Sequence, residues 1–182
     1  RAFENGNGIG LYGNGYTNAS GVAETPGGLP TGGNLASTQS VTRLYQLAAY
    51  SSSNSLLLRS ASATTYGGAV SGTLSFANQY RSTYSTLYVL ASTGSGTGTV
   101  DYTINFSDAT TANGQLTFAD WYLAIASTLS SINMKRVNSS SGTLDTRYDF
   151  NLFDLPVTIP GSSQGKFINS VVFSRSISSR RS

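Results

Sequence analysis

The sequence predicts an all-β protein, an antiparallel sandwich or barrel of about 8 to 10 strands. Short runs rich in Thr, Tyr, Val, Ile and Phe follow one another at intervals of roughly 8 to 14 residues, which is typical of such folds. Clusters of Gly, Ser and Asn separate these runs and are typical of turns. Only the segment near residues 120–130 has a helix-like pattern, with Asp120 as its N-cap, so we expect at most one short helix.

Two runs in the middle of the chain are the clearest strands. In "GTVDYTINFS" the apolar residues Val100, Tyr102, Ile104 and Phe106 alternate with polar ones, which predicts one face in the core and one in water. In "STLYVLAST" both faces are apolar, which predicts a central strand. The "TGSGTG" between them is predicted to be a hairpin turn and not a phosphate loop, because no helix follows it.

Other strands follow from the same kind of pattern. Asn113-Gly114 is a strong hairpin signal and predicts a turn. Further strands are expected at residues 9–12, 43–50, 54–60, 71–77, 132–137, 146–159 and 167–176.

The length and composition favour one folded domain with two different ends. A chain of 182 residues with 38% hydrophobic content can bury one core. Residues 1–40 are rich in Gly and Asn and form a predicted N-terminal arm, packed on its own sandwich or on a neighbouring one. The sandwich occupies residues 41–176, and residues 177–182 form a basic tail.

Composition excludes several classes of function. Charged residues make up only 10% of the chain, so the surface is mainly hydroxyl and amide, and we expect a secreted, extracellular protein. The 11 basic residues do not form a stripe, which argues against a nucleic-acid partner. The absence of Cys and His removes disulfides, Ser-His-Asp and Cys-His catalytic arrangements and the common zinc frameworks. No apolar run of about 18 residues is present, so we expect no membrane-spanning helix.

The order of the strand-like segments carries a resemblance. From "YQLAAYSSSNSLLL" through "STLYVLASTGSGTGTVDYTINFSDAT" and "FADWY" to "TRYDFNLFDLPVTIP" and "INSVVFSRS", the chain resembles the galactose-binding-like jelly-roll domains of secreted bacterial surface proteins and carbohydrate-binding modules. The resemblance covers about residues 41–175. It implies a jelly-roll sandwich that binds sugars through loops at one end, in many cases with a structural calcium ion.

The candidate carbohydrate-binding residues are the aromatic and polar side chains that we expect in or beside loops. An aromatic ring stacks on the apolar face of a pyranose, and a neighbouring carboxylate accepts its hydroxyls. The alternative for the single tryptophan, and the one that we favour, is that it closes one end of the core. The candidates are Trp121, Tyr122, Asp120, Tyr66 and Arg147.

A calcium site is an open alternative. Six to eight oxygens must converge on such an ion, and Glu4, Asn7 and Asp108 are the candidate ligands. Asp and Asn also stabilise turns by bonding to their own backbone, which explains these residues without a metal.

Two classes of function follow. The first is a non-catalytic module for adhesion or carbohydrate binding at the cell surface or extracellular matrix, with a glycan as its partner. The alternative is a structural subunit of an extracellular filament or surface layer, in which copies of the chain associate through the N-terminal arm. A hydrolase fragment is a weaker third class, since it needs a pair of carboxylates in a cleft. Because the chain begins at Arg1, we expect that a preceding segment has been removed or omitted.

Overall fold

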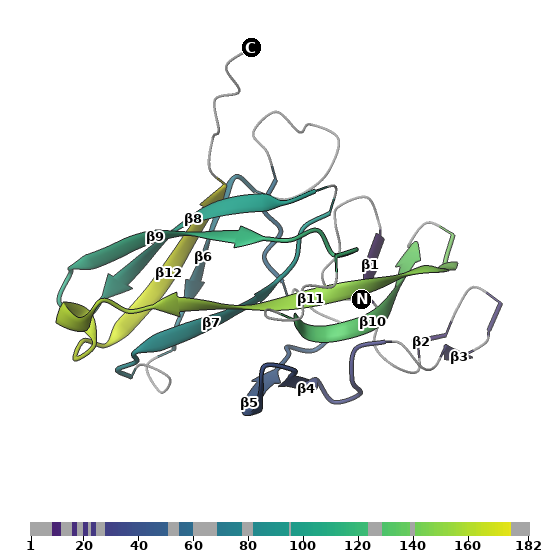
Figure 1. The fold of residues 1–182 in the computed structure, drawn as a ribbon, viewed down its shortest axis with the longest axis horizontal. Helices are drawn as coiled ribbons and strands as arrows, with labels where there is room; N and C mark the ends of the chain where they lie inside the picture. Colours follow the sequence, from purple (N-terminus) through teal and green to yellow (C-terminus); the bar gives the residue numbers. More distant parts are fainter. Residues whose placement is uncertain are drawn as a thin grey trace, which may run out of the picture.

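The computed structural model consists almost entirely of antiparallel strands (Figure 1). It describes residues 9–11, 16–17, 20–21, 23–24, 28–50, 55–59, 69–77, 82–94, 96–123, 129–138 and 141–175. One four-stranded sheet has the order β1 (Ile9–Leu11), β10 (Leu129–Asn138), β11 (Leu144–Thr158) and β7 (Thr86–Ala91). The other has the order β6 (Ser71–Ser75), β12 (Ile168–Arg175), β8 (Gly98–Phe106) and β9 (Thr111–Phe118).

Two small hairpins complete the described strands. They are β2 (Tyr16–Thr17) with β3 (Ala23–Glu24), and β4 (Asn34–Ser37) with β5 (Ser40–Gln46). The prediction of an all-β antiparallel sandwich is confirmed, and the eight strands of the two larger sheets agree with the expected number. Within the described residues, no helix is long and apolar enough to cross a membrane.

The sandwich core lies between the sheet β6-β12-β8-β9 and the strands β7 and β11. Alternation along β8 directs Ile104 and Phe106 inward, where both are buried, so the predicted core face of this strand is confirmed. Val171 and Phe173 of β12 and Val157 of β11 belong to the same cluster. Burial of apolar surface on both facing sheets is what holds the two layers together.

Strand β11 is long enough to belong to two cores. Its C-terminal end contributes Val157 to the sandwich core, whereas its middle contributes Phe150 and Leu152 to a second cluster. This second cluster also contains Trp121 of the β9–β10 connection and Leu35 of β4. In Figure 1, β11 accordingly runs from the sandwich at the left to β10 and β1 at the right.

The described part of the N-terminal arm packs on its own chain. β1 pairs with β10, and the β4–β5 hairpin is bound to β11 through the buried carboxylate of Asp154. That carboxylate accepts hydrogen bonds from Ser37 Oγ at 2.5 Å, Arg43 Nη1 at 2.5 Å and Tyr45 OH at 2.6 Å. The hairpin spans the boundary predicted at residue 40, since β4 lies before it and β5 runs through it.

Two predictions about the β7–β8 region are wrong. β7 is an edge strand and not a central one, although its apolar residues contact both clusters: Val89 packs against the sandwich core and Leu90 against the second cluster. The "TGSGTG" segment is not a hairpin, because β7 and β8 lie in different sheets and the segment connects them. Apolar residues on both faces therefore reflect two cores and not a central position in the sheet.

The predicted turn at Asn113-Gly114 is also wrong, because both residues lie inside β9. The turn is at residues 107–110, where Ala109 has a positive φ of 65°. Gly114 pairs with Tyr102 across the sheet, and a Cβ atom on this glycine would collide with the Tyr102 ring. Glycine therefore makes room here for an aromatic neighbour and does not supply a turn.

Two other segments differ from expectation or are only partly described. Within 54–60, the described residues 55–59 form only an isolated bridge between Leu58 and Ala69, and the Leu56 side chain packs over Gly72 of β6. In the predicted helical segment, Trp121 and Tyr122 form a turn and β10 begins at Leu129. Residues 124–128 and the tail 177–182 lie outside the described residues.

Candidate binding surfaces

Trp121 closes the second cluster. Its side chain is only 4% exposed, and its ring lies edge-on to Phe150 with the ring centroids 4.9 Å apart. Its backbone is fixed from two directions, since its N–H donates to Thr93 O at 2.9 Å and its carbonyl accepts the Asn151 N–H at 2.8 Å. Burial supports the core interpretation of this tryptophan, because a buried ring offers no face on which a sugar can stack.

An arginine lies against the aromatic rings beside Trp121. The guanidinium carbon of Arg136 is 4.6 Å from the Phe150 centroid, 5.4 Å from Trp121 and 5.7 Å from Tyr122. Its Nε and Nη2 donate to Asp145 Oδ2 at 3.0 and 2.7 Å. Cation–π contacts and the ion pair fix this guanidinium at the margin of the cluster, where Tyr122 is 40% exposed.

Sequence reasoning missed Arg136 and Asp145. The two residues are direct cross-strand partners in the β10–β11 hairpin, and an opposite-charge pair is a known stabilising pair at such positions. The signal was present as Lys-Arg before a Ser-Gly turn and Asp after it. The register of a hairpin can be assigned only once its turn is located, so this pairing does not follow from the sequence alone.

Asp120 has a structural role. Its Oδ1 accepts the Tyr122 N–H at 3.2 Å, and its Oδ2 accepts the Gly96 N–H. The carboxylate thus ties the β7–β8 connection to the turn after β9. Of the predicted sugar-binding residues, Asp120, Trp121 and Tyr122 lie together, while Tyr66 and the side chain of Arg147 lie outside the described part of the structure.

Asp108 is already neutralised by a lysine. Lys166 Nζ lies 2.9 Å from its Oδ2, and Thr110 Oγ1 donates to its Oδ1 at 2.6 Å. The hydrogen bonds from Thr110 and Lys166 lower the pKa of Asp108 to about 2. Glu4 and Asn7 lie outside the described residues, and within the described ones no three acidic side chains gather as metal ligands would.

An apolar cavity of about 370 Å³ lies between the sandwich and the segment after β5. Its walls include Leu47, Leu58, Leu74, Val89 and Phe173. Among the described residues that line it, only Tyr45 and Arg175 are titratable. Burial of Tyr45 and its hydrogen bond to Asp154 raise the pKa of its phenol, so it stays protonated and is unsuited to act as a base.

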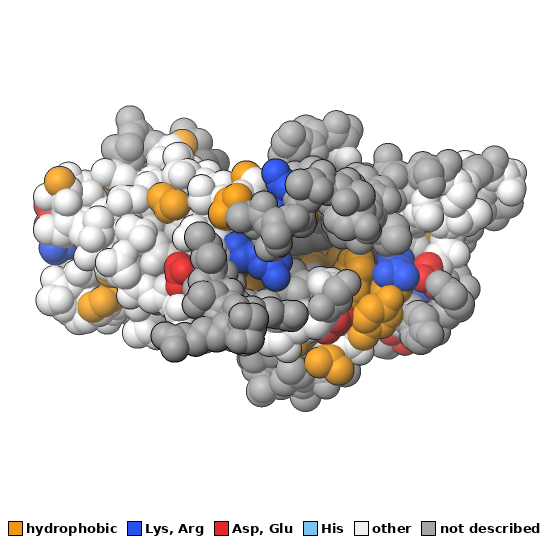
Figure 2. All heavy atoms as spheres, turned by 90° about the horizontal axis from the view of Figure 1, so that it is seen from above, with side chains coloured by type: hydrophobic (Ala, Val, Ile, Leu, Met, Phe, Trp, Pro, Cys, Tyr) orange, Lys and Arg blue, Asp and Glu red, His pale blue; other side chains and the backbone are white. Residues whose placement is uncertain are grey.

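The outer face of the sheet β6-β12-β8-β9 is polar and nearly uncharged. We call it the polar face. It consists of Ser71, Thr73 and Ser75 of β6, Ser170, Val172 and Ser174 of β12, Thr99, Asp101, Thr103 and Asn105 of β8, and Thr111, Asn113, Gln115 and Thr117 of β9. Asp101 is its single charged residue. Seen from above in Figure 2, the region over these strands is mainly uncharged polar side chains and backbone.

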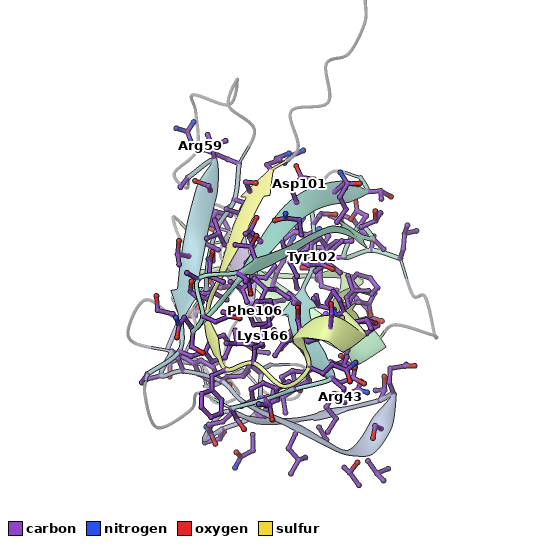
Figure 3. The ribbon with its side chains drawn as sticks, turned by 90° about the vertical axis from the view of Figure 1, so that its left-hand side faces the viewer. Arg43, Arg59, Asp101, Tyr102, Phe106 and Lys166 are labelled. Carbon is purple, nitrogen blue, oxygen red and sulfur yellow. The ribbon has the colours of Figure 1, made fainter. Side chains whose placement is uncertain are left out.

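Hydrogen bonds across the strands hold the polar face in order. Gln115 Nε2 donates to Asp101 Oδ1 at 2.7 Å, and Thr103 Oγ1 donates to Asn113 Oδ1 at 2.8 Å. Asn105 Nδ2 donates to Ser170 Oγ at 3.0 Å. Figure 3 shows Asp101 at the outer side of this sheet and Tyr102 and Phe106 toward the interior. The pleat thus places one set of side chains in the core and presents the other to solvent.

Comparison with known proteins finds no relative of the chain. No family model matches the chain, and neither a curated protein nor a solved structure matches it. The resemblance to galactose-binding-like domains therefore stays a prediction.

Proposed function

We propose that the chain is a secreted, non-catalytic module for adhesion that binds a polysaccharide through the polar face. The observation that carries this proposal is the set of hydroxyl and amide groups held in rows by cross-strand hydrogen bonds, such as Thr103 with Asn113 and Asn105 with Ser170. Groups that are already ordered lose little conformational entropy when a ligand binds.

A polyhydroxylated polymer is the ligand class that fits this surface. Sugar hydroxyls donate and accept hydrogen bonds, and the polar face offers both kinds of group, with donors in Thr and Ser and donor-acceptor pairs in Asn and Gln. With Asp101 as the single charge, a neutral ligand need not displace bound counterions. Many weak contacts along an extended chain add up by multivalency, so a flat sheet face needs no deep pocket.

The described carboxylates support a non-catalytic role. Asp108, Asp145, Asp149 and Asp154 each pair with a lysine or arginine, and Asp101 and Asp120 each accept a hydrogen bond. A glycosidase needs two carboxyl groups that flank the glycosidic bond. One has a raised pKa and donates a proton, and the other is ionised. Carboxylates that are engaged in ion pairs and hydrogen bonds within the chain are poorly placed to donate a proton to a leaving group or to attack a sugar.

The contacts of the described arm residues favour adhesion over the filament alternative. The described arm residues are bound within their own chain, β1 to β10 and the β4–β5 hairpin to Asp154. Donation of this segment to a neighbour would first break these contacts.

A binding titration tests the proposal. We expect native protein to bind at least one soluble polysaccharide in a panel saturably, and the triple substitution Thr103→Val, Asn105→Val and Ser170→Ala to weaken that binding at least tenfold. The substitution Thr42→Val is the matched control, because it removes the hydroxyl of an exposed strand residue outside the polar face. Absence of binding to the whole panel at millimolar sensitivity, or equal binding by the triple variant, would overturn the proposal.

A further inference from the structure

Strand β9 presents a free edge. It is the last strand in the order β6-β12-β8-β9, and within the described part of the chain no other strand pairs with its outer side. Its pairing with β8 runs from Asn105 opposite Thr111 to Gly98 opposite Phe118 without a shift in register. The edge is therefore free of bulges over eight residues.

The hairpin fixes which backbone groups face outward. Phe106 N donates to Thr110 O at 3.0 Å, and hydrogen-bonded pairs alternate with non-bonded pairs along an antiparallel ladder. By this alternation, Ala112, Gly114 and Leu116 bond to β8. The residues that direct their N–H and C=O groups away from β8 are Thr111, Asn113, Gln115 and Thr117.

This edge lacks the usual protection against pairing. Natural proteins block long edges with charged residues, proline, bulges or very short strands. The sequence of β9, TANGQLTF, contains neither charge nor proline, and its ladder has no bulge. The other edge strands of the two larger sheets are shorter: β1 has three residues, β6 has five and β7 has six.

We propose that two copies of this chain associate by antiparallel pairing of their β9 edges about a two-fold axis at Gly114. Thr111 then lies opposite Thr117 of the partner subunit, and Asn113 lies opposite Gln115 of the partner subunit. Each of the four residues whose backbone groups point outward thus lies opposite another such residue of the partner subunit. The outward N–H and C=O groups of both edges can therefore hydrogen-bond to each other. The uncharged edge suits a second copy, because self-pairing places no like charges opposite each other.

The pairing joins two sheets into one continuous sheet of eight strands. It also makes the polar face continuous across the two copies. This dimer goes beyond the proposed function, because it can form whether or not a polysaccharide binds.

The test is the mass of the full chain by sedimentation velocity over a range of concentrations. We expect native protein to approach about twice the monomer mass of 19.1 kDa. The double variant Asn113→Lys, Gln115→Lys places lysine opposite lysine twice and should raise the dimer dissociation constant at least tenfold. The variant Asn113→Glu, Gln115→Lys places glutamate opposite lysine twice and should dimerise at least as well as native protein.

The two variants share Gln115→Lys and differ only at position 113. A difference in their dimer dissociation constants therefore tests whether position 113 lies opposite position 115 of the partner subunit. In both, the ammonium group introduced at position 115 lies opposite Asp101 of its own chain and can pair with it, so we expect both variants to fold. Circular dichroism checks that each is folded. A native chain that stays monomeric, masses beyond a dimer, or equal dimerisation by both variants would overturn the proposal.

Discussion

At the scale of single residues, Asp154 is the residue that joins the β4–β5 hairpin to β11. Its side chain is fully buried, and three side chains from the β4–β5 hairpin donate to it. A buried carboxylate is stable only when cations and donors replace its lost water. The position of this acid in a strand was predicted, but its partners were not, because they are more than a hundred residues away in sequence.

Loss of the Asp154 carboxylate should lower the free energy of unfolding much more than loss of an exposed carboxylate on the same strand. We expect Asp154→Asn to lower the free energy of unfolding by about 2–4 kcal/mol, since Arg43 loses its counterion and Ser37 its acceptor. Asp149 pairs with Lys135 but is half exposed, so Asp149→Asn should cost about 0–1 kcal/mol. Urea unfolding of both variants measures the difference, and equal losses would contradict this role of Asp154.

The pKa of Asp108 depends on Thr110 and Lys166. Its pKa of about 2 lies below the ordinary 3.8, so its contribution to stability is present above the ordinary value and is lost as pH falls through the lowered one. We expect Thr110→Val or Lys166→Gln to move the carboxyl pKa back toward 3.8. Titration of the side-chain carbonyl signal by NMR measures this, and an unchanged pKa in both variants would contradict the assignment.

At the scale of elements, the sequence predicts strands better than it predicts how they pair. The alternation of Ile104 and Phe106 located β8 and its buried face, because period-two patterning is a local property. The Asn113-Gly114 pair predicts a turn but lies inside β9, since the reason for the glycine is Tyr102 on the neighbouring strand. Likewise, the predicted sugar-binding residues follow from residue type alone. The polar face cannot be predicted in this way, because it depends on the register of four strands.

The glycine in β9 provides a test of that pairing. A methyl group at position 114 would overlap the Tyr102 ring, so we expect Gly114→Ala to destabilise the protein by about 1–3 kcal/mol. Gly165→Ala is the matched control, because a Cβ there meets nothing nearby, and it should change stability by less than about 0.5 kcal/mol. Thermal unfolding compares the two, and a neutral Gly114→Ala would show that Tyr102 does not lie across this glycine.

At the scale of the whole molecule, one strand supports two packed regions. β11 contributes to the sandwich core with its C-terminal end and to the cluster around Trp121 with its middle residues. The prediction of one folded unit followed from length and composition, but the second cluster could not be predicted, because it depends on how the arm packs against β10 and β11. The polar face lies on the side of its sheet that faces away from the sandwich core.

The measurement that tests the central claim most directly is NMR mapping of the amide signals during addition of a soluble polysaccharide that binds. The account predicts shifts that cluster at β8, β9 and β12, within residues 98–106, 111–118 and 168–175. Shifts confined to the neighbourhood of Tyr122 and Arg136, or to the walls of the apolar cavity, would contradict the polar face as the binding surface.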